Sequence, residues 1–228
     1  MQDDLKNIFD KYAQNNIWGD ADSLSGGGSN LIQTATIRKE IPNLIKNYQI
    51  KSMVDAPCGD YFWMREIQAI LEKELDNYHG LDIVASLVAK NKETFGSFKT
   101  TFSQVDITSQ AIPKVDLIFT RDCLVHLSFA NIYKVMRNYK KSQSKYLLTT
   151  TFTNRNHNRD IFDGDWRTLN LELAPFFFPK PILLINENCT EGEGNYADKC
   201  LGLWEIKSLP SFSRLSIFIH NRILNKFS

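Results

Sequence analysis

Asp55, Asp82 and Asp106 each follow a short apolar run, and Gly59 lies four residues after the first of them. A glycine there lets the backbone approach a ligand closely, because it carries no side chain. Asp82 lies roughly 20 residues further on, where an acid hydrogen-bonds ribose hydroxyls in nucleoside-binding folds. Asp106 could accept a hydrogen bond from an exocyclic amine, with Ile107 beside it as an apolar surface. The spacing therefore indicates a nucleoside-containing ligand.

A second polar group, Arg121, Asp122 and His126, could act on a reacting atom beside that ligand. The imidazole of His126 titrates near neutral pH, so it could accept the proton that a hydroxyl loses in a reaction. Asp122 could act as the base or orient a substrate, because it lies nearer to the end of the preceding apolar run. A packing or capping role for His126 and a structural ion pair for Arg121 are open alternatives.

These residues are far apart in the sequence, so they can act together only if the fold brings them to one edge of a sheet. The hydrophobic pattern predicts such a sheet. Strand-like runs alternate with helical stripes from residue 50, which is typical of right-handed βαβ crossovers and a parallel sheet covered on both faces. Ligands bind such a sheet beyond the carboxyl ends of its strands, where the residues above fall. Runs at 181–188 and 199–206 are joined without a helix and predict a terminal antiparallel hairpin. The expected parallel strands lie within residues 50–56, 77–84, 98–107, 115–120 and 145–152.

The N-terminal part precedes this doubly wound core. Residues 3–16 carry one apolar helical face, and a second stripe at residues 31–45 predicts a helix interrupted near Pro42. Between them, the SGGGS loop fits either a flexible linker or a cover over a bound ligand. We therefore expect a helical cap with a glycine loop, a core and a C-terminal tail at residues 1–48, 49–207 and 208–228.

The composition excludes several classes of protein. Of the 228 residues, 43% are hydrophobic and 23% charged, which suits one α/β domain with a sizeable core. A formal net charge of +1 argues against a dedicated nucleic-acid partner. The first residues lack a signal-peptide pattern and no run approaches the roughly 20 apolar residues of a membrane span, so we expect a cytoplasmic protein. The four cysteines form no CxxC pair, and Asp122 with Asn154 would supply too few ligands for magnesium, so we expect no metal.

In order along the chain, VDAPCGD, GLDIV, QVDIT and VDLIFTRDCLVHLS resemble the motifs of class I S-adenosylmethionine-dependent methyltransferases. The resemblance covers residues 50 to about 206. It implies a Rossmann-like α/β sheet of seven strands, parallel with a terminal antiparallel hairpin and with helices on both faces. It also implies methyl transfer from the cofactor S-adenosylmethionine, although Pro57 and Tyr61 stand where the family often has glycine. It places at the cofactor Asp55, Pro57, Gly59, Asp82, Ile83, Asp106, Ile107 and Arg121, with Asp122 and His126 as catalytic candidates.

Segments outside these motifs resemble a narrower group, bacterial small-molecule methyltransferases encoded with surface-polysaccharide (capsule) genes. They are WGDADSLSGGGSNLIQTATIRKEIP, GDWRTLNL and NENCTEGEG. The implied acceptor is an oxygen of a small polar molecule, such as a sugar, nucleotide-linked or phosphoramidate precursor of a capsule. A compact domain rarely carries a long irregular segment without a function, so the region after residue 152 is expected to face this substrate. The candidate substrate-binding residues are Asp165, Trp166, Arg167 and Asn188.

Two other functions fit parts of the sequence. A catalytically silent cofactor-binding subunit would carry Asp82 and Asp106 in the same way. A nicotinamide-dependent oxidoreductase fits less well, because the turn PCGDYF has one glycine where pyrophosphate binding uses Gly-x-Gly-x-x-Gly. Nucleic-acid base methylation is disfavoured, since TRDC replaces the Pro-Pro-aromatic element that holds a flipped base. Oxygen and nitrogen acceptors are both compatible with the motifs.

The C-terminal tail carries an apolar helical stripe that begins at Phe212, together with basic residues that no acid balances. This pattern predicts either a helix packed on the domain or a basic amphipathic helix in weak contact with a membrane surface or a protein partner. Neither role bears on methyl transfer, for which the expected partner is a small molecule.

Overall fold

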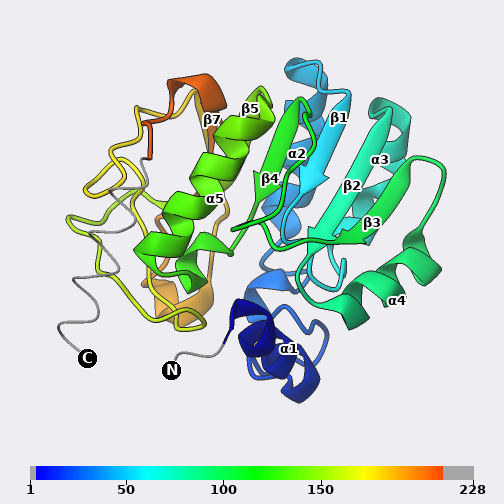
Figure 1. Cartoon of the computed structure of the whole chain (residues 1–228), viewed down its shortest axis with the longest axis horizontal. Coiled ribbons are helices and arrows are strands. Elements are labelled where there is room, and N and C mark those ends of the chain that lie inside the picture. The colour runs from blue at the N-terminus through cyan, green and yellow to red at the C-terminus, as the bar shows by residue number, and fades with distance from the viewer. Residues whose placement is uncertain (1–3, 213–228) are drawn as a thin grey trace.

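A single seven-stranded sheet runs through the computed structural model, which describes residues 4–212 (Figure 1). Its strands are β1 Ser52–Asp55, β2 Asn77–Asp82, β3 Thr100–Gln104, β4 Leu117–Thr120, β5 Tyr146–Phe152, β6 Leu183–Asn186 and β7 Lys199–Glu205. Their order is β3-β2-β1-β4-β5-β7-β6, with parallel pairing from β3 to β5. Strand β7 is antiparallel to both β5 and β6. The predicted parallel sheet with a terminal antiparallel hairpin is thereby confirmed.

The central strands are apolar on both sides because both faces of the sheet are covered. Met53 and Val54, adjacent in β1, are fully buried yet belong to different hydrophobic clusters, one on each face. All seven residues of β5 are buried as well. A parallel sheet between two layers of helices has this pattern, since successive side chains point to opposite faces.

Three helices cover one face of the sheet and one long helix covers the other (Figure 1). They are α2 Ala35–Asn47, α3 Gln68–Glu74 and α4 Ala85–Phe95 on the first face and α5 Phe129–Ser142 on the second. The expected interruption near Pro42 is wrong, because α2 continues through this proline. Ile37, Ile41 and Leu44 bury one stripe of α2 against the sheet, and this packing holds the helix together despite the missing backbone donor.

Beyond the carboxyl ends of the strands lies the N-terminal cover, which we define as helix α1 (Leu5–Asn15) with residues 16–29 (Figure 1). Asn16 ends α1 in the left-handed conformation, with φ 45°. Asp60, in the turn after β1, accepts hydrogen bonds from the backbone of Leu24 (2.8 Å) and the hydroxyls of Ser23 and Ser25. The cover is therefore attached directly to the first turn of the core.

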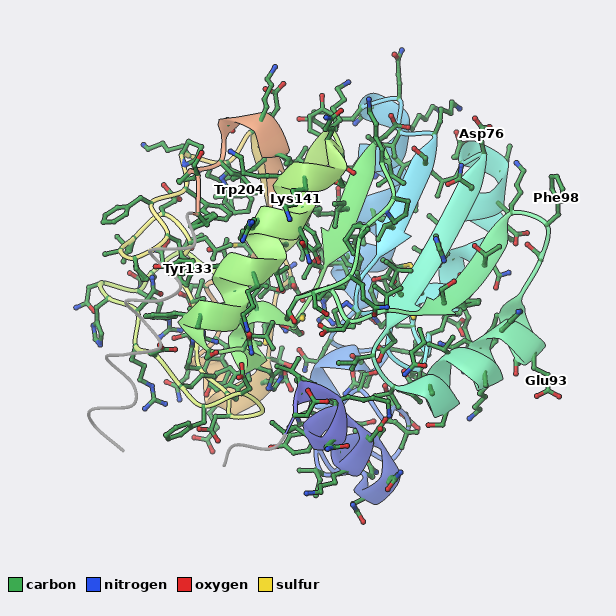
Figure 2. All side chains as sticks on the ribbon, in the orientation of Figure 1. Asp76, Glu93, Phe98, Tyr133, Lys141 and Trp204 are labelled. Atoms are coloured by element: carbon green, nitrogen blue, oxygen red, sulfur yellow. The ribbon has the colours of Figure 1, made fainter. Side chains whose placement is uncertain are left out.

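The segment from 153 to 182 has no helix or strand and takes the place of a helix beside β5. Phe176 contacts Phe129 and Tyr133 of α5, with ring centroids 5.1 and 5.9 Å apart. Tyr133 lies on this side of the molecule, whereas Phe98 lies at the opposite edge of the sheet (Figure 2). The segment is thus anchored on α5 and can present its polar residues at the sheet edge.

Phe212 is the last described residue, and it stacks on Tyr133 with ring centroids 5.1 Å apart. The predicted tail from residue 213 onward lies outside the described residues. Within residues 4–212, no helix has both the length and the apolar character needed to cross a membrane.

Candidate functional site

A cavity of about 1130 Å³, including its open mouth, lies between the carboxyl ends of β1, β2 and β4 and the N-terminal cover. We call it the cofactor cavity. This volume, which includes open space, is an upper limit and is of the order of pockets that hold small-molecule ligands and cofactors. Ten predicted residues line it: Asp55, Pro57, Gly59, Asp82, Ile83, Asp106, Ile107, Arg121, Asp122 and His126.

The turn after β1 brings backbone rather than side chains to this cavity. Gly59 has φ +55°, and a Cβ atom there would lie 2.2 Å from the hydroxyl oxygen of Ser25. Glycine is therefore required both by the backbone conformation and by the approach of the cover. Tyr61 adopts φ 59° and fills the space under the turn with a buried ring. The turn thus keeps its shape with a single glycine.

Asp82, at the end of β2, is held in place by the backbone around it. Its carboxylate accepts hydrogen bonds from the amides of Gly59 and Val84, each 2.9 Å long. Burial raises the pKa of Asp82 to about 6, while these backbone donors act to lower it. Each carboxylate oxygen has a second lone pair, so the side chain can still accept hydrogen bonds from ligand hydroxyls.

Asp55 differs from Asp82 in charge. Its carboxyl is buried and accepts a 2.5 Å hydrogen bond from the hydroxyl of Tyr78. Burial raises the pKa of Asp55 to about 8, so it is protonated at neutral pH. A protonated carboxyl can donate one hydrogen bond to a ligand while it accepts the one from Tyr78.

Asp106 lines the cavity, but its carboxylate also closes a turn. It accepts hydrogen bonds from the backbone and hydroxyl of Thr108, at 2.8 and 2.7 Å, and from the hydroxyl of Ser109. Ile107 and Ile83 contribute apolar surface to the same end of the cavity. This end therefore suits a flat, mostly apolar group with polar edges.

Four charged residues, three of them buried and Asp122 partly exposed, form a network at the sheet edge where β4 and β6 end and β7 begins. Arg121 pairs with Glu187 (2.7 Å) and Asp122 (3.3 Å), and Lys199 pairs with Asp122 (2.6 Å). Burial opposes ionisation of Asp122, but the charges of Lys199 and Arg121 outweigh it and lower the pKa of Asp122 to about 2. Asp122 is thus a fixed carboxylate and a poor proton acceptor.

His126 is the better proton acceptor of the two catalytic candidates. Its Nδ1 lies 3.0 Å from the carbonyl oxygen of Asp165. A carbonyl oxygen can only accept, so Nδ1 carries the hydrogen and Nε2 keeps its lone pair. Burial lowers the pKa of His126, which leaves the imidazole neutral at neutral pH. Its ring lies 5.3 Å from that of Trp18 in the cover.

A second cavity, which we call the inner pocket, opens beside these residues. It shares Trp18, Ser25, Asp122 and His126 with the cofactor cavity. Its other lining residues are Gly26, Gly27, Gly28, Phe152, Trp166, Cys189, Glu191, Tyr196 and Lys199. A group in the inner pocket would therefore meet a group in the cofactor cavity at Asp122 and His126.

The predicted substrate residues do not all lie at this pocket. Trp166 lines it, and Asp165 acts through the backbone carbonyl that binds His126. Arg167 is buried and donates to the carbonyls of Leu124 and Leu127, each at 2.6 Å, so it anchors the irregular segment. Asn188 lies outside the lining of the three cavities described, and its amide donates to Thr36 (3.1 Å).

Several residues that shape the inner pocket escaped the sequence-based reasoning. Trp18 and Glu187 lie in loop segments whose resemblance to the capsule-associated group gave them no individual role, and Tyr196 lies in a loop just after those segments. Lys199 had a usable signal, because a lysine that begins an otherwise apolar strand requires a buried partner. Its strand β7 is antiparallel, so the first residue of β7 lies at the same edge as the last residues of the parallel strands.

Metal ligands do not gather in the described part of the chain, where no three His, Cys, Asp or Glu side chains are placed to hold one ion. Asp122 is paired with Lys199, and the backbone amide of Asn154 donates to Asp198 (2.9 Å).

No protein-family model matches the chain, and no curated protein matches it in sequence. Among solved structures, the citrinin polyketide synthase CMeT domain matches 79% of this chain, with TM-score 0.55 and 17% identity. The methyltransferase domain of bacterial CtHen1 matches 77%, with TM-score 0.54 and 12% identity. The chain spans 54% of the first domain and 100% of the second.

The S-adenosylmethionine-dependent methyltransferase from Mesorhizobium loti also matches, over 45% of this chain and 46% of its own, with TM-score 0.37 and 16% identity. Identities this low bear on architecture rather than on activity. The strand order and the two broader matches agree, and the chain has the class I methyltransferase fold.

Proposed function

We propose that this protein is a methyltransferase that uses S-adenosylmethionine to methylate an oxygen atom of a small polar acceptor. The observation that carries the proposal is the junction of the two cavities at Asp122 and His126. One cavity has the acids and apolar surfaces that suit a nucleoside, and the other provides space for an acceptor. A neutral imidazole lies where the two would meet.

The residues around the cofactor cavity suit S-adenosylmethionine. Asp82 would accept hydrogen bonds from its ribose hydroxyls, and Ile83 with Ile107 would contact the adenine. The Gly59 turn and the buried Asp55 would hold the methionine part through backbone and carboxyl groups. When bound, S-adenosylmethionine supplies a methyl group that its positively charged sulfur has already activated.

The chain itself then has three tasks. The N-terminal cover, with Trp18 beside His126, keeps water away from the reacting atoms. Asp122, fixed by Lys199 and Arg121, orients the acceptor with an ionised oxygen. The Nε2 atom of His126 takes the proton that a hydroxyl loses, because the imidazole is neutral and its Nδ1 is already committed to Asp165.

We also propose a surface-polysaccharide precursor as the acceptor class. Support comes from the segments whose sequence resembles the capsule-associated group. Trp18, Gly28, Trp166 and Glu191 belong to those segments and all line the inner pocket. A cytoplasmic site of action fits precursors of this kind.

Calorimetric titration tests the cofactor assignment. We expect binding of S-adenosylmethionine and of its demethylated product, and no binding of nicotinamide dinucleotides. Tight binding of a nicotinamide dinucleotide alone would overturn the proposal. A transfer assay with labelled S-adenosylmethionine, across sugars, nucleotide sugars and phosphoramidates, then tests turnover. Cofactor binding with no transfer to any hydroxyl acceptor would instead favour a catalytically silent subunit.

A further inference from the structure

We infer that the acceptor carries a phosphoryl group and that this group binds in a third cavity, the outer basin, while the methylated atom lies in the inner pocket. This inference rests on the proposed function and specifies its substrate class. The outer basin is lined by Thr153, Asn154, Arg155, Asn156, His157, Arg159, Trp166, Arg167, Thr168 and Tyr196.

The three cavities lie in series. The cofactor cavity meets the inner pocket at Asp122 and His126, and the inner pocket meets the outer basin at Trp166 and Tyr196. The rings of Trp166 and Tyr196 are 5.0 Å apart, and Phe152 contacts both, with ring centroids 6.3 and 6.1 Å away. One extended molecule could therefore pass these aromatic rings and occupy both the inner pocket and the basin.

The outer basin is basic. Its lining includes three arginines and one histidine and no acidic residue. Asp198 pairs with Arg155 (2.5 Å) from outside the lining, and Asp160 and Asp163 act on the charge of Arg167. Burial lowers the pKa of Arg167 only to about 10, so it remains charged at neutral pH.

Arg159 is the side chain most available to a ligand. It is exposed, and its guanidinium makes no hydrogen bond or ion pair with residues 4–212. His157 uses Nδ1 for a 2.7 Å contact with the Asn156 side chain, which leaves Nε2 for a ligand. Arg155 has a buried Nε atom without a partner, next to its ion pair with Asp198. Planar guanidinium groups bind phosphate oxygens in paired hydrogen bonds.

The inner pocket has the opposite character, which fixes the orientation of the acceptor. A Cβ atom on Gly28 would lie 3.3 Å from carboxylate oxygens of both Asp122 and Glu191, and 3.5 Å from the ammonium group of Lys199. With Arg121 and Glu187 beside them, three carboxylates stand against two cations, so a phosphoryl group would be repelled. The basin accepts such a group without that penalty, so the neutral hydroxyl end points inward to His126.

Inorganic pyrophosphate is a suitable probe of the basin. It is titrated into the full-length protein with saturating S-adenosylhomocysteine, at an ionic strength held constant with sodium chloride. We expect binding that Arg159→Gln weakens about tenfold, as for the loss of a charge-assisted hydrogen bond. The matched control is Lys90→Gln, which removes the same charge from an exposed position on α4, at the β3 side of the sheet. It should leave pyrophosphate affinity unchanged.

Indole fluorescence locates the bound anion. Pyrophosphate should change the emission of the wild-type protein, and Trp166→Phe should abolish most of that change. The inference is wrong if the wild type does not bind pyrophosphate, if both charge variants lose affinity equally, or if pyrophosphate competes with S-adenosylhomocysteine. Titration of S-adenosylhomocysteine alone and the transfer assay report on the proposed function separately, since that function fails if the cofactor product does not bind or if no acceptor is methylated.

Discussion

The cofactor cavity and the inner pocket share Asp122 and His126, yet they draw on different kinds of segment. The cofactor cavity is built at the carboxyl ends of parallel strands, by the last residues of β1 and β2 and by residues that directly follow β1, β2, β3 and β4. The inner pocket is built by the N-terminal cover, the loop before β7 and the first residue of β7, Lys199. In a parallel strand, the residues that face a ligand lie at the carboxyl end of the strand. An antiparallel strand such as β7 instead places its first residue at that edge.

The two regions also differ in how they handle charge. In the cofactor cavity Asp55 is neutral and the carboxylate of Asp82 is bound by backbone amides. These two acids therefore offer a ligand hydrogen bonds and little net charge. At the junction of the two cavities Arg121 on the cofactor side, the shared Asp122 and Lys199 in the inner pocket hold one another as ions. We therefore expect substitutions in the first region to change binding, and substitutions in the second to change turnover and folding.

The largest effect is expected for His126→Asn. The asparagine amide can still donate to the carbonyl of Asp165, but it has no atom that can take the proton at the position of Nε2. Turnover should fall by roughly 10²- to 10⁴-fold while cofactor affinity stays near the wild-type value. In the wild type, the rate should fall at acid pH with a midpoint below 6.5, the ordinary pKa of histidine. The pH–rate profile of the variant should lack this fall. Full turnover of this variant would remove His126 from the mechanism.

Next in size is the loss of stability expected for Lys199→Met. This change leaves the buried carboxylate of Glu187 and the partly exposed carboxylate of Asp122 with Arg121 alone. Breaking a buried ion pair from one side costs about 3–5 kcal/mol in the free energy of unfolding, measurable with urea. Lys207→Met is the control, because Lys207 is exposed and its pair with Glu205 contributes about 1 kcal/mol or less. Equal stabilities of the two variants would show that the network is not structural.

A smaller effect, on binding alone, is expected for Asp82→Asn. The amide oxygen can keep one backbone donor, but the charge that binds ribose hydroxyls is lost. Affinity for S-adenosylhomocysteine should fall about ten- to a hundredfold, as for a lost charged hydrogen bond of about 1.5–3 kcal/mol. Calorimetric titration measures this affinity, and a thermal melt verifies that the variant is folded. Unchanged affinity would contradict the ribose assignment.

The last effect is a gradual pH dependence of stability due to Asp55, which is small over any one pH unit. The unfolded chain ionises this group near 3.8, whereas the fold keeps it protonated to about pH 8. The folded state binds the extra proton between these values, so Asp55 lowers stability as pH rises through this range, by up to about 1.4 kcal/mol per pH unit.

Asp55→Asn removes this dependence and keeps an acceptor for Tyr78. The melting temperature of the variant, relative to wild type, should rise from pH 5 to pH 8 in the ligand-free protein. For Asp76→Asn, at an exposed position, the difference in melting temperature from wild type should not change with pH. If this difference is also independent of pH for Asp55→Asn, Asp55 is ionised in the folded protein.

The sequence grouped Asp55, Gly59 and Asp82, and the structure places all three at one cavity, because their positions depend only on local strand and turn patterns. It predicted the hairpin as well, from two apolar runs without a helix between them. The acceptor side was harder, because Trp18 and Tyr196 come together only in the tertiary structure. Arg167 shows the limit, since its charge suggested substrate binding but its guanidinium holds backbone carbonyls inside the irregular segment.

A crystal structure with S-adenosylhomocysteine would show whether the two cavities meet at the reacting atoms. We expect the ribose hydroxyls at Asp82, the adenine between Ile83 and Ile107, and the sulfur facing His126 across the opening to the inner pocket. A ligand bound elsewhere, or bound with its sulfur turned away from His126, would contradict this expectation.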